Sequence, residues 1–576
     1  MFQNHSLNAN GKLLRRFYEP LVLLSVLDPT RGAHRPDLIT DRGLDEKSKL
    51  WRNYVDQLSF VCDSDKGGDT VTAVAAQQTS EASIFWLASN SNSREKARDH
   101  LIWIFARLER LYTASSISTA QLQDEINARC IEFCSERIKT YSTWLLQAIR
   151  KVKRAKKKPM SHEDQVLSEG LEHFESLMTD PHQLCAFAHS FRKSESMKIL
   201  CERHNAQSSR GIWSDIRHYI GRLGSWTKAA QILILGAQKF PQRIENAQIK
   251  VIGPNGPVDR PSNTHMTDFR GVVHRMLPVD QAVLVEELSQ VLIDADSVAQ
   301  IESQFREDYA GIKPRPHAEL LVLEHFHRNG FSFVAGDKYI GCSKPSCYCC
   351  HAYIQCHPGV FTPRPCHGNL WINWAPPIPL PIITPGNGRG PSARPQEHHT
   401  FQMLQKMVVP IRQDLQDQIL SRRPKRKRLP DSTTGMSSVV YEIHASRTVL
   451  DYNAGEPEQR SEDYSGPQFI PFEDKNGTDI RSVIAEDGAS ESCPESADRE
   501  NHDHLSSEEH TTTTQERSGK YEDNAHENHD KKAQLVYVEN WIKQLSRRRR
   551  TDPGDDENED DDDDDDDDSD GGVLLF

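Results

Sequence analysis

The sequence predicts an α/β protein with a mainly helical domain, a second domain of helices and short strands, and a charged tail. Apolar residues recur at helical spacing in the first part of the chain, apolar and polar residues alternate near residue 247, and apolar periodicity ends after Ser421. A chain of 576 residues also exceeds what one hydrophobic core commonly organises. We therefore predict an irregular lead-in at 1–44, a mainly helical domain at 45–243, a second domain at 244–421 and a disordered tail at 422–576.

The first two parts are predicted from composition and spacing. Residues 1–44 mix a short apolar run with proline and arginine, so we expect no regular element there. Leu101, Ile104 and Leu108 fall on one face of a helix. Cys130 and Cys134 are four residues apart on a similar segment, and the lack of further ligands nearby in the sequence favours core packing over a two-thiol site.

A basic segment interrupts the helical domain. Residues 150–158 carry seven lysines and arginines in nine positions, too many to pack together, so they form a solvated helix end or loop. Contact with a phosphate backbone and a nuclear import signal are the functional alternatives.

The second domain opens with a strand and continues as helices around short strands. Ile249 and Val251 alternate with polar residues and Gly253-Pro254 ends the strand. Pro316 at the first turn begins a helix and Gly330 closes it. We further predict helices over 284–305, 347–355 and 396–420, short strands over 331–335 and 338–341, and an extended proline-rich connector over 376–395.

The tail is predicted from its composition. It is rich in Ser, Glu, Asp, Thr and His and cannot bury enough apolar area to offset chain entropy. An island of apolar residues at helical spacing predicts a helix at 533–546, which either docks a protein partner, folds back, or forms transiently. The basic run 422–428 fits nuclear import and also a nucleic-acid ligand.

Charge and targeting signals narrow the cellular context. The net charge is −14, and most of that excess comes from the aspartate run 560–568, so the folded part is close to neutral. The N-terminal residues lack the apolar core of a signal peptide, and the apolar run 21–27 is too short to span a bilayer. We expect an intracellular protein of the nucleus or cytoplasm, not bound to membrane, whose cysteines are thiols or metal ligands.

Four residues of the second domain fit a catalytic zinc site. His317 lies at one helix N-terminus, and Cys347 and Cys350, at i and i+3, begin another helix and share its face. Three such ligands on Zn²⁺ leave a fourth position for water, whose pKa falls to about 7. Glu319, two residues beyond the histidine, would not bind metal but would shuttle the proton of that water.

This pattern resembles the nucleic acid and nucleotide deaminase superfamily. The resemblance rests on His317-Ala-Glu319 and Cys347-x-x-Cys350, and the flanking 339–344 and Trp374-x-x-Pro377 resemble a deaminase-like branch abundant in fungi. It covers roughly residues 245–420 and implies a cytidine-deaminase-like fold, a mixed sheet flanked by helices with zinc between two helix N-termini. One departure is that Ser346 separates Pro345 from the first cysteine, where the superfamily has proline directly before it.

The substrate side is predicted from residue chemistry. Tyr348, Trp371 and Trp374 could stack a base, and His367 and Asn369 could contact its edge, although each fits a core position as well. The predicted function is zinc-dependent hydrolytic deamination of a nucleobase, of the cytidine or adenosine type, in nucleic acid or a nucleotide.

Two alternatives stay open. In one, a closed structural zinc site holds a protein-binding surface, with ligands drawn from Cys342, Cys347, Cys350, Cys356, His357, Cys366 and His367. In the other, a deaminase fold keeps zinc without turnover. Glu319 favours an enzyme over a closed site, because a structural site has no use for that carboxylate. Cys342, Cys349, Cys356 and Cys366 could pack or bind a second metal, and His325 and His327 are expected to be surface or core histidines.

Overall fold

The structure is a computed structural model that describes residues 9–31, 43–91, 93–113, 118–155, 161–206, 211–253, 258–262, 268–277, 281–380 and 395–428. All of these residues belong to one of the two compact units into which the chain divides.

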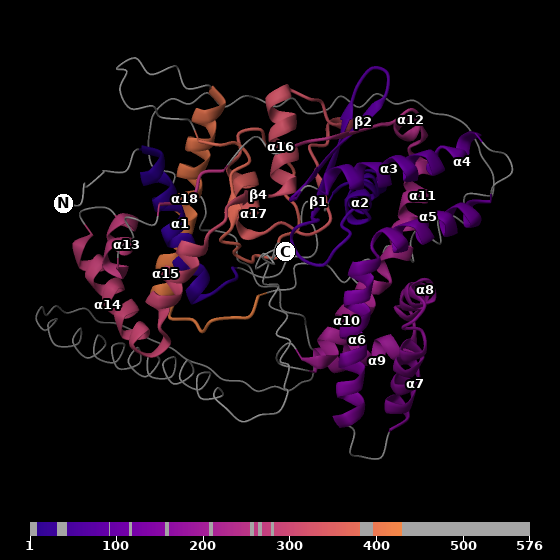
Figure 1. The fold of residues 1–576 in the computed structure, drawn as a ribbon, viewed down its shortest axis with the longest axis horizontal. Coiled ribbons are helices and arrows are strands. Elements are labelled where there is room, and N and C mark those ends of the chain that lie inside the picture. The colour runs from indigo at the N-terminus through magenta and orange to yellow at the C-terminus, as the bar shows by residue number, and fades with distance from the viewer. Residues whose placement is uncertain are drawn as a thin grey trace, which may run out of the picture. The chain divides into compact units, whose positions relative to one another are not determined.

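A four-stranded mixed sheet lies inside this unit, with strand order β3-β2-β1-β5; Figure 1 labels its strands β1 and β2. β1 (Thr72–Gln78) and β2 (Ser83–Ser89) form an antiparallel hairpin, β3 (Gln248–Val251) runs parallel to β2, and β5 (Gly341–Cys342) runs antiparallel to β1. A second, parallel pair joins β4 (Arg315–Pro316) to β6 (Trp374–Ala375). The predicted α/β class with a mixed sheet flanked by helices is confirmed.

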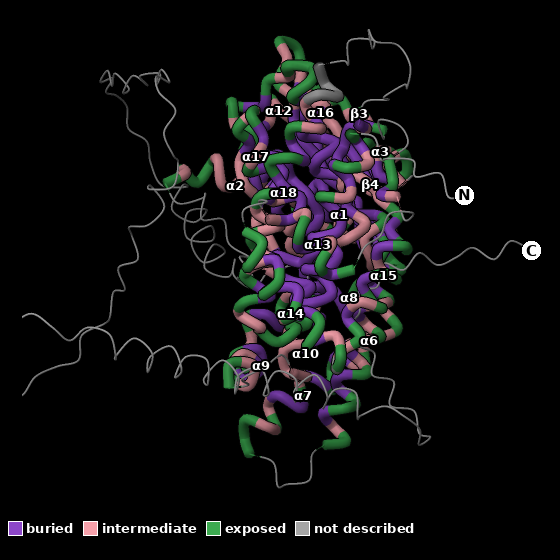
Figure 2. The backbone as a smooth tube through the Cα atoms, turned by 90° about the vertical axis from the view of Figure 1, so that its left-hand side faces the viewer, coloured by how far each residue is buried: buried purple, intermediate pink, exposed green. Residues whose placement is uncertain are grey.

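The two faces of the sheet belong to two hydrophobic cores. Successive side chains of a strand point to opposite faces, and in β1 Ala73 and Ala75 join one core while Val74 and Ala76 join the other. Buried positions gather between the helices that cover these faces (Figure 2). The sheet is therefore the shared layer of both cores.

The core on the Val74 side is built by helices from the first half of the chain. α2 (Glu46–Phe60) packs on β1 and β5, and a Cβ at Gly341 of β5 would come within 2.6 Å of the Val55 backbone, so this approach requires glycine. The helices of this core are α2 (Glu46–Phe60), α3 (Arg94–Leu108), α4 (Arg110–Thr113), α5 (Thr119–Phe133), α6 (Ser135–Ala155), α7 (His162–Ser176), α8 (Pro181–Phe191), α9 (Glu195–Asn205), α10 (Ile212–Leu223), α11 (Ser225–Lys239) and α12 (Pro241–Ile244).

The core on the Ala73 side is built mostly by the second half. α16 (Ala318–Asn329) packs on β1 and β2, and α17 (Tyr348–Cys356) packs on α16 and α18 (Pro395–Ser421). α1 (Ala9–Leu27) and α18 lie side by side (Figure 1). The helices of this core are α1 (Ala9–Leu27), α13 (Phe269–Met276), α14 (Ala282–Ala299), α15 (Ile301–Gly311), α16 (Ala318–Asn329), α17 (Tyr348–Cys356) and α18 (Pro395–Ser421).

The prediction of an irregular lead-in is wrong for residues 9–27, which form α1. Pro20 lies inside this helix, and residues 21–27 are all buried against the core. Packing against α18 and α15 supplies the stability that local signals did not indicate, because a helix buried on all sides needs no polar face.

The hairpin of β1 and β2 lies in the stretch predicted as mainly helical and pairs with strands on the other side of residue 244. The domain boundary at residue 244 stays a prediction, and the sheet contains strands from both sides of that boundary. The short strands predicted at 331–335 and 338–341 are corrected to a 3₁₀ turn, Val334–Gly336, and to β5. Positive φ angles at Ala335 and Gly336, 58° and 71°, bend the chain out of a strand.

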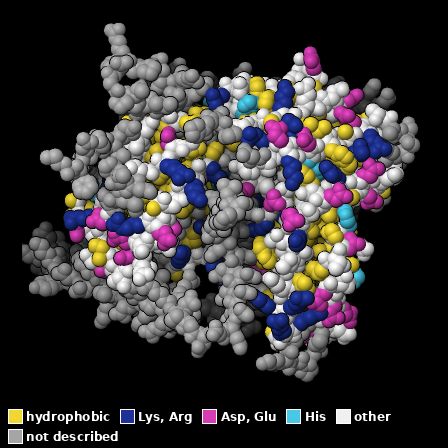
Figure 3. All heavy atoms as spheres, viewed as in Figure 1, with side chains coloured by type: hydrophobic (Ala, Val, Ile, Leu, Met, Phe, Trp, Pro, Cys, Tyr) yellow, Lys and Arg dark blue, Asp and Glu magenta, His cyan; other side chains and the backbone are white. Residues whose placement is uncertain are grey.

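Several other sequence expectations are confirmed. α17, α18 and β3 lie where they were predicted, α14 and α15 share the stretch predicted as one helix, and Gly330 ends α16 in the left-handed conformation. Residues 150–155 form the mostly exposed end of α6, and Cys130 and Cys134 are buried in the core. On the visible described surface, basic and acidic side chains are interspersed (Figure 3).

Some predictions fall outside the described residues. These are the basic positions 156–158, positions 381–394 of the proline-rich connector, the tail after residue 428, and the helix at 533–546. Across the described part of the chain, every helix is either too short or too polar to cross a membrane.

Candidate metal centre and its pocket

His317 is fixed at the beginning of α16. It is the N-cap residue, with φ −85° and ψ 148°, directly after β4, whose pairing with β6 holds the backbone extended. The next amide, Ala318 N, donates a hydrogen bond to Asn90 Oδ1 at 2.7 Å. A helix N-terminus leaves such amides without intrahelical partners, so Asn90, which follows β2, secures the helix beside the histidine.

Cys347 and Cys350 occupy the first turn of α17. Cys347 is the N-cap residue, and its Sγ accepts a hydrogen bond from Cys350 N at 3.4 Å. The displaced Pro345 does not prevent this arrangement. Ser346 N donates to Pro365 O at 2.8 Å and Ser346 O accepts from His367 N at 3.1 Å, so the turn before Cys347 is held by backbone pairing.

The three side chains converge on one point. His317 Nδ1 lies 3.2 Å from Cys350 Sγ and 3.6 Å from Cys347 Sγ, and all three atoms lie within 4.8 Å of one another. Zinc bonds of about 2.0–2.1 Å to nitrogen and 2.3 Å to sulfur place tetrahedral N and S ligands about 3.6 Å apart. The residues present therefore fit a metal ion with one nitrogen and two sulfur ligands.

The electrostatics of the group also suit a cation. Burial raises the pKa of Cys347, but hydrogen bonding with Cys350 and the charge of His317 lower it to about 6. Burial lowers the pKa of His317, yet the Cys347 thiolate shifts it upward overall. The pKa of Cys350 is raised well above its usual range by burial, by Cys347 and by Glu319. One thiolate thus forms readily near neutral pH, and a bound cation would favour the second.

Glu319 lies beside the three ligands without joining them. Its side chain is buried, lies next to the Cys350 thiol, and faces the same cavity as His317 and Cys347. α16 places it on the first turn, two residues after His317. A carboxylate in this position can exchange protons with a group bound at the open side of a metal ion.

Trp374 forms a hydrogen bond with one of the two sulfur ligands, Cys350. Its indole is fully buried, and Nε1 donates a hydrogen bond to Cys350 Sγ at 3.3 Å. Tyr18 in α1 donates to Trp374 O at 2.8 Å. Trp374, which was predicted to stack a base, instead lies in the core and orients Cys350, as hydrogen-bond partners of metal ligands commonly do.

A cavity of about 180 Å³ opens beside the metal centre. It is smaller than the roughly 300–1,000 Å³ typical of sites for drug-sized ligands, so its size suits one compact ring. Besides His317, Glu319 and Cys347, its charged and polar lining includes Asn90, Asp308, Arg315, Lys344, His367, Asn373 and Arg428.

The predicted substrate residues divide between pocket and core. His367 and Trp371 line the cavity. Tyr348 points toward α18, where its hydroxyl donates to Asp414 Oδ2 at 2.6 Å. Asn369 is buried and its backbone N donates to His367 Nδ1 at 3.1 Å, so it holds the ring of His367.

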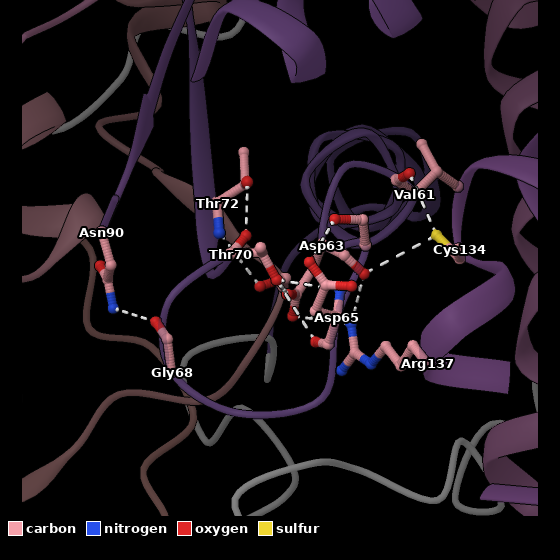
Figure 4. A network of polar contacts seen from close by, with 11 residues as sticks. Val61, Asp63, Asp65, Gly68, Thr70, Thr72, Asn90, Cys134 and Arg137 are labelled. Carbon is pink, nitrogen blue, oxygen red and sulfur yellow. Dashed lines mark hydrogen bonds and ion pairs between the residues drawn. The ribbon is translucent and has the colours of Figure 1, made fainter. Parts of the chain in front are cut away.

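The loop before β1 forms another wall of the cavity and is held by the helical core (Figure 4). Gly68 O accepts a hydrogen bond from Asn90 Nδ2 at 2.8 Å, and Thr70 Oγ1 donates to Asp63 Oδ1 at 2.7 Å. Asp63 in turn forms a fully buried ion pair of 2.7 Å with Arg137 in α6. The helical core thus fixes one wall of the pocket.

Among the described residues, the closed seven-ligand set does not assemble. The two groups of three or more ligand atoms found there are His317–Cys347–Cys350 and Glu324–His357–His399. Cys342 faces the cavity near Glu319, Cys349 is buried, and Cys356 and Cys366 are half-buried. The ring centroid of His325 lies 4.2 Å from that of Trp86 with the planes tilted by 55°, and the ring centroid of His327 lies 4.6 Å from that of His357, as expected of non-ligand histidines.

The group of Glu324, His357 and His399 is a hydrogen-bonded cluster and not a metal site. Glu324 Oε1 lies 3.2 Å from Nε2 of both His357 and His399 and accepts from Tyr353 Oη at 2.5 Å. Gly359 N donates to His357 Nδ1 at 3.0 Å, so the proton of a neutral His357 lies on Nε2, where a metal would bind. The group connects the distal ends of α16 and α17 to α18.

Asn90, Gly68, Arg315, Lys344 and Arg428 also line the cavity but were not predicted as site residues. Only Arg428 carried a signal, since it belongs to the basic run at 422–428. The other positions depend on contacts between segments far apart in the chain.

A model of the OTT_1508-like deaminase family (OTT_1508_deam) matches residues 316–378. The match spans His317, Glu319, Cys347 and Cys350 and supports the resemblance of this segment to the deaminase-like superfamily. No curated protein and no solved structure matches the chain.

Proposed function

We propose that the protein is a zinc-dependent hydrolytic deaminase that acts on a nucleobase in nucleic acid or a nucleotide. The observation that carries this proposal is the position of Glu319, buried beside His317, Cys347 and Cys350 at the wall of one cavity. A purely structural metal site would not need an acidic side chain on its open side.

The residues divide the chemistry as follows. His317 Nδ1 and the sulfurs of Cys347 and Cys350 would hold zinc, which supplies a water nucleophile that is active near neutral pH. The water oxygen would bond to the ring carbon that bears the amine, while Glu319 takes one water proton and delivers it to the adjacent ring nitrogen. Glu319 would then pass the remaining hydroxyl proton to the leaving amine. The C–N bond to the exocyclic amine breaks, ammonia leaves, and a carbonyl remains on the base.

The pocket walls would orient the base and exclude bulk water. Trp371 and His367 both line the cavity, and the Asn369 backbone N holds the His367 ring at Nδ1. Reading a base by stacking and by edge hydrogen bonds is the mode expected of deaminases that act on a flipped or single-stranded base.

Ammonia release tests the proposal. Purified wild-type protein should release ammonia from at least one member of a panel of cytidine, adenosine and guanosine, their 5′-monophosphates, and single-stranded DNA and RNA. Glu319→Gln should abolish release while zinc content stays at the wild-type level. A zinc-loaded wild-type protein that deaminates nothing on this panel would favour the alternative of an inactive deaminase-fold scaffold.

We also propose an intracellular location, in the nucleus or the cytoplasm, with import through 422–428. A protein partner for the helix predicted at 533–546 belongs to the same set of proposals. Expression of a tagged full-length chain with and without substitutions in 422–428 tests the first, and a binding screen with the isolated 533–546 peptide tests the second.

A further inference from the structure

The basic segment 423–428 is attached to the body of the protein. The Arg426 guanidinium forms an ion pair with Asp28, with Nη2 2.8 Å from Oδ2, and its Nη2 also donates to Thr30 O at 2.6 Å. Asp28 is fully buried. A buried carboxylate requires charged partners, here Arg426 and, at 3.9 Å, Arg31, so the contact ties the segment after α18 to residues 28–31.

The residues that hold Arg426 also hold one wall of the cavity. Leu370 N donates to Pro29 O at 2.8 Å, and Arg31 N donates to Gly368 O at 2.8 Å. Gly368 has φ +74°, and a Cβ there would come within 2.0 Å of Arg31 O, so the close approach depends on glycine. Residues 28–31 therefore join the basic segment to the wall at 368–371.

Arg428 lies at the cavity as a result. Its guanidinium carbon lies 4.8 Å from the centroid of the Trp371 ring, and the residue shares the cavity lining with His317 and Glu319. Its Nε is buried without a hydrogen-bond partner, and no ion pair joins Arg428 to another described residue. A buried N–H donor without a partner at the wall of a pocket is suited to an anionic ligand.

The charged lining of the cavity carries both signs, with the cations Arg315, Lys344 and Arg428 and the acidic residues Asp308 and Glu319. Arg315, which pairs with Asp69, and Lys344 line the same cavity. Asp308 also lines it, and burial raises the pKa of Asp308 whereas Lys425 and Arg428 act to lower it. A guanidinium stacked on an indole is held in one plane, which leaves its N–H donors ready for the oxygens of a phosphate.

We propose that Arg428 binds a phosphate group attached to the nucleoside whose base enters the cavity. The proposal rests on the proposed function and adds a subsite to it. The phosphate can come from a free nucleotide or from the backbone of a single strand, because both present the same group beside the base.

Specificity measurements test this subsite. For the base that is deaminated, kcat/KM is compared among the nucleoside, its 5′-monophosphate and a single-stranded oligonucleotide. Wild type should prefer a phosphorylated ligand, and Arg428→Ala should reduce that preference about 10- to 100-fold, as expected for one hydrogen-bonded charge pair. Arg428→Lys should retain part of it. Arg423→Ala is the matched control, since it removes an exposed charge from the same segment outside the cavity.

Comparing the monophosphate with the oligonucleotide, and adding a binding assay, distinguishes the possible results. A preference for the monophosphate identifies a free nucleotide, and a preference for the oligonucleotide identifies a strand. An Arg428→Ala protein with the wild-type preference, or a wild type with none, would overturn the subsite. Equilibrium binding of the same ligands to zinc-loaded Glu319→Gln protein gives a readout without turnover. Arg428-dependent binding without any ammonia release would refute the proposed function alone, whereas ammonia release without Arg428 dependence would refute the subsite alone.

Discussion

The buried ion pair between Asp63 and Arg137 offers a strong test of how the helical core supports the pocket. Both side chains are fully buried, Arg137 Nη1 lies 2.7 Å from Asp63 Oδ2, and Nη1 also donates to Asp63 O at 2.9 Å. Arg137→Met keeps an extended side chain but leaves the Asp63 carboxylate buried without its charged partner. We expect the free energy of unfolding to fall by about 3–5 kcal/mol, the usual result of removing one member of a buried pair.

Urea unfolding followed by circular dichroism measures this change. The matched control is Lys198→Met, which removes a lysine from the exposed pair of Lys198 with Glu195 and should change stability by less than about 0.5 kcal/mol. A second variant, Asp63→Asn together with Arg137→Met, removes both charges and should recover part of the loss. If Arg137→Met unfolded within about 0.5 kcal/mol of wild type, or the double variant were less stable than the single, the reasoning would be refuted.

Two further predictions concern α16. Asn90→Ala removes the acceptor for Ala318 N and should lower the free energy of unfolding by about 1–2 kcal/mol. Asn53→Ala, which loses only a local contact with Gln57, should change the free energy of unfolding little. Equal effects of the two variants in urea unfolding would contradict this role of Asn90. Burial raises the pKa of Glu324, but hydrogen bonds from His357, His399 and Tyr353 lower it from 4.5 to about 2. The ionised Glu324 therefore stabilises the fold above pH 4.5, and this stabilisation is lost as the pH falls toward 2. Glu324→Gln should flatten the pH dependence of unfolding between those values, and an unchanged slope would exclude Glu324 as its source.

The parts of the site that lie close together in sequence were predicted from the sequence. Cys347 and Cys350 are three residues apart at the beginning of α17, so spacing alone placed both on one helix face, whereas His317 and Glu319 at the beginning of α16 were paired through the His-x-Glu pattern. The structure brings three of them into one group of ligand atoms. The caps and residue spacing that place these side chains lie within a few residues of one another, which is why these relations were accessible from the sequence.

The parts that depend on distant segments were not predicted. Asn90 reaches α16 because β1 and β2 enter a sheet with β5, and nothing in the alanine-rich sequence of β1 indicated a central strand. α1 was read as irregular because Pro20 and the short apolar run suggested no helix, and its stability comes from packing against α18. Trp374 was assigned to the substrate because an aromatic residue near a site has the same sequence signal whether it lines the pocket or supports a ligand.

The central claim is a three-ligand metal site with an adjacent carboxylate that does not bind the metal. Zinc content per chain, measured by plasma mass spectrometry on protein purified without added metal, tests it most directly. We predict about one zinc per chain in wild type and in Glu319→Gln, and loss of zinc in His317→Ala and Cys347→Ala. Cys349→Ala, which alters a buried thiol outside the ligand group, should keep its zinc. Retention of zinc in both His317→Ala and Cys347→Ala, or its loss in Glu319→Gln, would contradict the account.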